Sequence, residues 1–511
     1  MRLKNVFRNS FFSLVSQFVL IIIGFFSQRV MNFIMGEALV GMNSVISNII
    51  AILSVSELGI AVAVVFHLYK ALAAKKEDEI AALMNLYRRA YYIFATVISL
   101  AGLCVMPFVH IFLKENHFPL SYVRLIYFLW LVRTVLSYLL SYKRSILIAD
   151  QREYIVSIVT LLINLLNYGS IIVILLLWRN YQLALLLNIV VESLLNVWII
   201  HYVNKQYPFL KRYQRKPLDR GVVSTILGDI KNIFISRLST KLLVSTDNLI
   251  ISSFISVIMV GLYSNYSLIM QSIMNVMVAL ANAVQPTVGN LFTEHDQNKN
   301  YQVLRQMGFV FFVLASFCAA SLMSLSSIFV TDFWLTESYG LSVEIVICCV
   351  ANIYLFIMNQ PTSIVMAVSG MFDKERNISV LYATVNLVLS LSLVKPLGVA
   401  GVLIGTFASY LVQIVFRIHF FFSDYLCISS ARYVADMIQY GVLALLETGL
   451  TYWTVQIVYQ DGGLMRFILA MVICVCIPNI INLLLFMKSW RMQSIVHMVK
   501  DMVQKRTTGI D

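Results

Sequence analysis

Apolar stretches of about twenty residues follow one another along almost the whole chain, from Ser10 to Trp490. A stretch of that length, wound as an α-helix, crosses the roughly 30 Å hydrocarbon core of a membrane. Only 12% of the 511 residues are charged, against roughly 25% in soluble domains. No polar interval between the stretches is long enough to hold a soluble domain. The sequence therefore predicts an all-α polytopic membrane protein.

Loop breaks divide these stretches into about fourteen helices, with twelve or thirteen as the alternative count. Lys and Arg residues gather in the loops on one side, above all in the basic run at 205–220. The positive-inside rule then places both termini in the cytoplasm, and we expect a bacterial plasma membrane. The predicted helices span residues 10–34, 39–69, 88–113, 121–147, 153–178, 181–204, 228–256, 258–292, 306–331, 341–370, 376–394, 398–422, 432–458 and 464–488.

The net charge of +13 is explained by these loops, so no nucleic-acid partner is predicted. The seven cysteines lie almost all in apolar runs, and Cys474 and Cys476 have no histidine or acid near them. We therefore predict no metal site. The chain also lacks a phosphate-binding loop and a nucleophile elbow, so neither an enzyme nor a cofactor is predicted.

The first six helices resemble the next six at an offset of 217 to 223 residues. The sequence VGMNS at 40–44 recurs as VGLYS at 260–264, and Asn164 corresponds to Asn386. An even number of helices in each repeat makes the repeats parallel, an arrangement found in transporters with the substrate path between the halves. The predicted domains are a lobe at 1–204, a basic linker at 205–227, a second lobe at 228–424, and two extra helices with a basic tail at 425–511.

Ionisable side chains inside the predicted helices are candidates for function, because each costs roughly 2.5–3.5 kcal/mol at the bilayer centre. The first half holds Arg29, Glu57 and Arg133. The alternative for Arg29 is snorkelling to the surface, and for Arg133 a buried structural ion pair. Glu57 is expected to bind a coupling cation, a proton or Na⁺, or to set the conformation.

In the second half, Arg237 and Lys241 are four residues apart and stack on one face of a helix. Ser245 and Asn248 continue that face, and Asp247 lies beside it. A cationic stripe facing lipid is costly, so we expect it to face a watery cavity.

Two Gln-Pro-Thr triplets mark helices that we expect to be irregular. Gln285 and Pro286 begin one triplet, and Gln360 and Pro361 begin the other. Proline removes a backbone hydrogen bond, which suits a moving gate, although many membrane prolines are simply tolerated.

A set of short motifs, spread over nearly the whole chain, resembles bacterial polysaccharide flippases. These proteins belong to the superfamily of multidrug, oligosaccharidyl-lipid and polysaccharide exporters. The motifs are SELG at 56–59, LYK at 68–70, YLLSYKR at 138–144, ADQ at 149–151, TDNL at 246–249, VGLYS at 260–264, PTVGNL at 286–291 and PLGVAG at 396–401.

The resemblance implies two six-helix lobes around a central cavity. It also implies a flippase that moves an undecaprenyl-pyrophosphate-linked oligosaccharide by alternating access, for O-antigen, capsule or a similar surface polysaccharide. In relatives, basic residues on the first and seventh helices matter, which carries onto Arg29 and onto Arg237 or Lys241. The last two helices resemble a pair that borders a groove for the lipid tail. A polymerase and glycosyltransferases of the same pathway are the implied partners.

Three other functions remain open from the sequence. A cation-coupled multidrug exporter of the same superfamily is the nearest, although such proteins usually have twelve helices and an acidic site. A membrane-embedded polysaccharide polymerase or glycosyltransferase generally needs a large external loop, and the outer loops here are short. A scramblase or an assembly scaffold would need no coupling to an ion gradient.

Overall fold

The computed structural model describes residues 2–54, 60–115, 117–212, 238–239, 241–242, 245–292, 296–460 and 462–493. Every regular element within these ranges is a helix. Eleven helices in the described part are long and apolar enough to cross a membrane. Large apolar side chains also point outward, among them Leu445, Met465 and Leu484. The prediction of an all-α polytopic membrane protein is confirmed.

The chain divides into two compact units. Unit 1 comprises Met1–Asn265 and Ser390–Val402, and unit 2 comprises Tyr266–Leu389 and Leu403–Asp511. The predicted division at the linker 205–227 lies mostly outside the described residues and stays a prediction.

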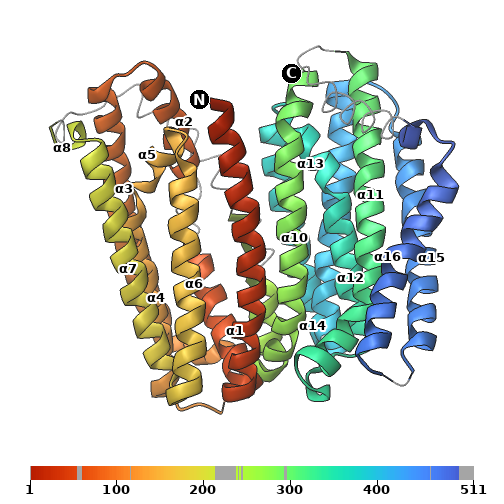
Figure 1. Cartoon of the computed structure of the whole chain (residues 1–511), viewed down its shortest axis with the longest axis horizontal. Helices are drawn as coiled ribbons and strands as arrows, with labels where there is room; N and C mark the ends of the chain where they lie inside the picture. Colours follow the sequence, from red (N-terminus) through yellow and green to blue (C-terminus); the bar gives the residue numbers. More distant parts are fainter. Residues whose placement is uncertain are drawn as a thin grey trace. The chain divides into compact units, whose positions relative to one another are not determined.

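In unit 1, α1 packs on α6, α6 packs on α7, and α4 packs on both α3 and α7 (Figure 1). The helices of this unit are α1 (Arg2–Leu53), α2 (Ile60–Ala73), α3 (Glu77–Val105), the 3₁₀-helix η2 (Met106–Phe112), α4 (Leu120–Ser141), α5 (Arg144–Ala149), α6 (Glu153–Trp178), α7 (Tyr181–Gln206), α8 (Phe209–Arg212) and the beginning of α10 (Val257–Phe292).

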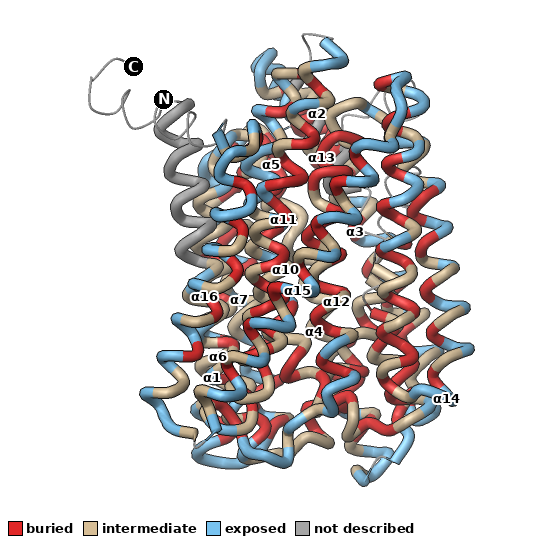
Figure 2. The backbone as a smooth tube through the Cα atoms, turned by 90° about the vertical axis from the view of Figure 1, so that its right-hand side faces the viewer, coloured by how far each residue is buried: buried red, intermediate tan, exposed pale blue. Residues whose placement is uncertain are grey.

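In unit 2, α11 is the central helix, because it packs against α12, α15 and α16. Buried residues recur along the whole length of α11 (Figure 2). The elements that follow α10 are α11 (Gln297–Ile328), the π-helix η3 (Phe329–Trp334), the 3₁₀-helix η4 (Glu337–Tyr339), α12 (Val343–Met358), α13 (Gln360–Val368), α14 (Phe372–Phe420), the π-helix η5 (Phe421–Leu426), α15 (Ala431–Val458) and α16 (Leu464–Phe486).

Two predicted breaks between helices appear in the structure as non-helical glycines inside α1 and α14, and the segments before and after each glycine are separate helices. α1 passes through Gly36 at φ 76°, and α14 passes through Gly398 at φ 59°. Glycine reaches these positive φ values without a steric penalty, so the chain turns there with no intervening loop. Of the predicted helix 39–69, the structure describes helix up to Leu53 in α1 and again from Ile60 in α2, and residues 55–59 lie outside the described residues. The predicted helix 228–256 lies mostly outside the described residues.

The repeated VG-x-x-S sequences meet where α1 crosses the beginning of α10. A methyl group on Gly41 would lie 1.9 Å from the Val257 carbonyl oxygen, and one on Gly261 would lie 2.0 Å from the Glu37 carbonyl oxygen. The hydroxyl oxygens of Ser44 and Ser264 are 2.8 Å apart. Small residues let helix backbones approach closely inside a membrane. The two copies of the repeat therefore contact each other in unit 1, where their glycines let the two helices approach closely.

Polar side chains beside this crossing are buried and bonded to one another. Asn32 Nδ2 donates to Asn265 Oδ1 at 2.7 Å, and Gln28 Nε2 donates to the same oxygen at 3.2 Å. These bonds join α1 and α10 one to three helical turns from the glycine contact.

We predict that Gly41→Ala destabilises the protein, because the new methyl group meets backbone atoms that cannot turn aside. Overpacking of this kind costs about 1–3 kcal/mol or more. Thermal unfolding of the detergent-solubilised protein should show a lower midpoint. Gly169→Ala in α6 is the matched control, since nothing lies within 4 Å of its added methyl group. Equal midpoints for the two variants would contradict the prediction.

Candidate functional site

Arg133 of α4 forms an ion pair with Glu192 of α7. Its Nε lies 2.8 Å from Glu192 Oε2, and the two side chains are 22% and 17% exposed. The guanidinium carbon also lies 5.2 Å from the centroid of the Trp130 ring. The sequence left a structural ion pair open for Arg133 but did not single out Glu192. The sequence could have indicated Glu192 as a candidate, because it is an acid inside an apolar run.

The ion pair belongs to a polar cluster that joins three helices of unit 1. Asn43 Oδ1 on α1 accepts a hydrogen bond from Trp130 Nε1 at 2.9 Å and another from the Tyr181 hydroxyl. We call Asn43, Trp130, Arg133, Tyr181 and Glu192 the unit 1 polar cluster. It holds a guanidinium in a fixed place between α4 and α7.

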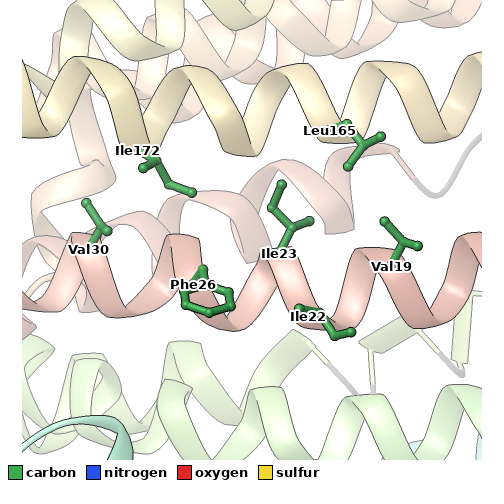
Figure 3. A pocket seen from close by; sticks show the side chains of 7 residues that line it. All are labelled: Val19, Ile22, Ile23, Phe26, Val30, Leu165 and Ile172. Carbon is green, nitrogen blue, oxygen red and sulfur yellow. The ribbon is translucent and has the colours of Figure 1, made fainter.

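Arg29 is exposed on α1, with its guanidinium carbon 5.7 Å from the centroid of the Phe33 ring. Beside it, an apolar cleft of about 420 Å³ lies between α1 and α6 (Figure 3). Among the described residues, none of the ion pairs includes Arg29. Its charge is thus available to a ligand or to solvent. The cleft is lined by Val19, Ile22, Ile23, Phe26, Val30, Leu165 and Ile172.

The predicted cationic stripe is only partly within the described residues. Lys241 is half-buried, Asp247 is 8% exposed, and Asn248 lies next to it. Arg237 and Glu57 lie outside the described residues. The roles of all five residues stay predictions.

The two Gln-Pro triplets differ in their backbone. α10 runs through Gln285 and Pro286 as one helix. Before Gln360 and Pro361 the regular helix is interrupted for one residue, because α12 ends at Met358 and α13 begins at Gln360, while the backbone of Asn359 between them stays helical at φ −75° and ψ −21°. The Gln360 side-chain nitrogen Nε2 donates to the Phe356 carbonyl oxygen at 3.1 Å, which supplies a hydrogen bond next to this interruption. The gating role of both triplets stays a prediction.

The interruption is held by a buried cation. Arg417 of α14 donates to Asn359 Oδ1 at 3.0 Å, and its guanidinium lies 2.5 Å from Glu375 Oε1. Neither Arg417 nor Glu375 was among the residues that the sequence singled out. Arg417 carried the same signal as Glu192, an ionisable side chain inside an apolar run, whereas the sequence did not indicate that its partner would be Glu375.

An apolar groove of about 880 Å³ runs along α15 in unit 2, with α11, α12 and α14 forming the rest of its wall. Its α15 lining extends from Ser430 to Tyr452, which is about 33 Å of helix. That length matches the roughly 30 Å hydrocarbon core of a bilayer. Gly441 and Gly449 lie in the lining and have no side-chain atom to fill it. The groove can therefore hold a long, thin apolar chain.

No protein-family model matches the sequence, and no curated protein matches it. Solved structures do match. The lipid II flippase MurJ, in an inward closed conformation, gives a TM-score of 0.69 at 12% identity and covers 93% of this chain and 98% of its own.

Multidrug transporters match as well. An inward-facing multidrug resistance MATE family transporter of the MOP superfamily gives a TM-score of 0.64 at 15% identity, covering 80% of this chain and 96% of its own. A MATE transporter from Vibrio cholerae gives 0.58 at 14% identity, covering 83% of this chain and 98% of its own. At these identities the likeness establishes the fold. The chain has the fold of the flippases and transporters of the MOP superfamily.

Proposed function

We propose that the chain is a flippase that moves an undecaprenyl-pyrophosphate-linked oligosaccharide across the bacterial cytoplasmic membrane by alternating access, for the synthesis of a surface polysaccharide. The observation that carries this proposal is the apolar groove along α15. A polyprenyl tail is long and apolar, so it needs a continuous apolar surface while its headgroup crosses. The likeness to a lipid II flippase supports the same substrate class.

The headgroup needs a polar path with positive charge, because a pyrophosphate cannot enter hydrocarbon bare. We propose that Arg29, Arg237 and Lys241 contact the pyrophosphate, with Arg133 held for the same purpose by Glu192. Arginine suits phosphate through paired, charge-assisted hydrogen bonds. In this proposal Glu57, Asp247 and Asn248 couple transport to a proton or Na⁺, and the helix interruption before Gln360 and Pro361 acts as a gate, together with Gln285 and Pro286. A polymerase and glycosyltransferases would act before and after transport.

Arg29→Ala and Lys241→Ala should each reduce flipping of an undecaprenyl-linked glycan in proteoliposomes. Loss of one charged hydrogen bond costs about 1.5–3 kcal/mol, or roughly a tenfold to hundredfold loss of rate. Lys205→Ala removes an exposed charge at the end of α7 and serves as the control. Protein levels should be equal in all variants. Normal flipping by both Arg29→Ala and Lys241→Ala would count against a cationic headgroup path.

Gly449→Leu should block the groove without disturbing the fold, because open space surrounds Gly449. We expect flipping of the lipid-linked glycan to fall at least tenfold, with the thermal unfolding midpoint unchanged. Gly169→Leu adds the same side chain to a helix of unit 1 that also has open space around its glycine. Wild-type flipping by Gly449→Leu would show that the lipid tail does not use this groove.

A cation-coupled multidrug exporter is the second candidate, favoured by the MATE structures that share the fold. Deleting the gene separates the two functions. A flippase deletion should reduce surface polysaccharide and leave drug sensitivity unchanged, whereas an exporter deletion should do the reverse. Gly449→Leu adds a second test, because a drug exporter has no lipid tail to place in the groove.

A further inference from the structure

Two carboxylates on α15 face the same two neighbours but differ in how their charge is compensated. Asp436 and Glu447 are eleven residues apart on α15, and their α11 partners Arg305 and Ser316 are also eleven residues apart. That spacing is about 16 Å along each helix. α11 and α15 therefore run in register and carry two polar layers, both within unit 2.

In the first layer the charge of the carboxylate is fully compensated. Asp436 Oδ2 accepts from Arg305 Nε at 2.7 Å, and Asp436 Oδ1 accepts from Arg491 Nη2 at 2.6 Å. Arg491 also donates to the Tyr440 hydroxyl. Each carboxylate oxygen thus has its own guanidinium, which is the arrangement that a buried ion requires.

In the second layer Glu447 takes the place of Asp436, and its hydrogen-bond partners are neutral. Glu447 is 1% exposed, and its Oε2 accepts from Asn482 Nδ2 at 3.3 Å. The same amide nitrogen donates to Ser316 Oγ at 3.2 Å. Glu447 Oε1 and Asn482 Oδ1 are buried without a hydrogen-bond partner in the described part of the chain.

No cation in the described ranges is paired with Glu447. Arg305 of α11 and Arg491, which follows α16, are both engaged by Asp436, and Lys488 is exposed. The other titratable side chains on α15 and on the two helices packed against it are Lys299, Tyr301 and Cys318 of α11, Arg432, Tyr433, Tyr440 and Tyr452 of α15, and Arg466, Cys474 and Cys476 of α16. Tyr354 of α12 also interacts electrostatically with Glu447. A bare carboxylate in this place would have no counter-charge, and burying one is costly.

We propose that Glu447 is a proton-binding site that controls how α15 packs. Glu447 Oε1 carries a proton in the packed arrangement, and loss of that proton to water leaves a charge that draws water between α15 and its neighbours α11 and α16. A proton fits better than Na⁺, because Asn482 Nδ2 donates to both Glu447 Oε2 and Ser316 Oγ, and a donor group does not coordinate a cation. A metal ion would need oxygen atoms there.

The site lies directly behind the wall of the apolar groove. Ala444, Leu445 and Thr448 line the groove, while Glu447 points to the other side of the same helical turn, toward α11 and α16. A change in the packing of α15 therefore changes the groove. That link to lipid transport rests on the proposed function, whereas proton binding itself does not.

Infrared difference spectroscopy on the full chain, without any substrate, tests proton binding. We expect the C=O stretch of a protonated carboxyl at neutral pH, lost in Glu447→Gln and kept in Glu344→Gln, which changes an exposed acid at the start of α12. The band should disappear as the pH rises. Identical spectra for wild type and Glu447→Gln would overturn the proposal, and so would a band that Na⁺ removes at constant pH.

Hydrogen exchange tests the effect on packing, again without substrate. Above the pH at which the band disappears, α15 peptides should exchange faster in the wild type than in Glu447→Gln at the same pH. Below it the two proteins should exchange alike, and α6 peptides should not differ at any pH. Equal exchange of α15 at high pH would overturn the control of packing.

A flipping assay with an imposed pH gradient then separates this inference from the proposed function. If the wild type flips the lipid-linked glycan, Glu447→Gln should lose the response to the gradient, and retention of the response would refute the link to transport. If the wild type flips no lipid-linked glycan, the proposed function fails, while the infrared and exchange results still decide on the proton site.

Discussion

The cost of placing charge in hydrocarbon organises the polar interior of this protein. Arg133 pairs with Glu192, Arg417 pairs with Glu375, and Asp436 holds two guanidinium groups. Two of these sets join different helices, and Arg417 with Glu375 joins the two helical segments of α14 on either side of Gly398. Charge compensation therefore also specifies which segments pack together. Glu447 departs from this rule, and its neutral partners make it the one acid in the described part of α15 that needs a proton.

Close backbone approach provides the second constraint. The copies of the VG-x-x-S repeat contact each other through Gly41 and Gly261, with the Ser44 and Ser264 hydroxyls bonded beside them. Van der Waals contact and short polar bonds replace the hydrophobic effect inside a membrane, where lipid is as apolar as leucine. A duplicated sequence thus explains both the internal similarity and a specific packing contact.

In the proposed function, the apolar groove and the cationic residues meet two different demands of one amphipathic substrate. A groove of bilayer length along α15 suits a tail that never leaves the hydrocarbon. Arginine and lysine side chains suit a pyrophosphate that must leave water for a time. α15 lines the groove, and α15 and α16 together bring Glu447 and Asn482 into contact. The tail groove and the proposed proton site therefore share one helix.

Hydropathy alone determined that the chain is a helical membrane protein, and it located most helices closely, with α6 at 153–178 as predicted. A helix must be apolar along its own length to enter lipid, so the local sequence of each segment is enough to predict a membrane-spanning helix. It also singled out Arg29 and Arg133. Only the tertiary structure decided that Arg133 is paired with Glu192, that the chain turns at Gly36 and Gly398 between adjoining helices, and that Glu447 faces Ser316 and Asn482. Ion-pair partners, neutral hydrogen-bond partners and groove walls come from helices that are distant in the sequence. Local hydropathy does not predict which of these helices pack together.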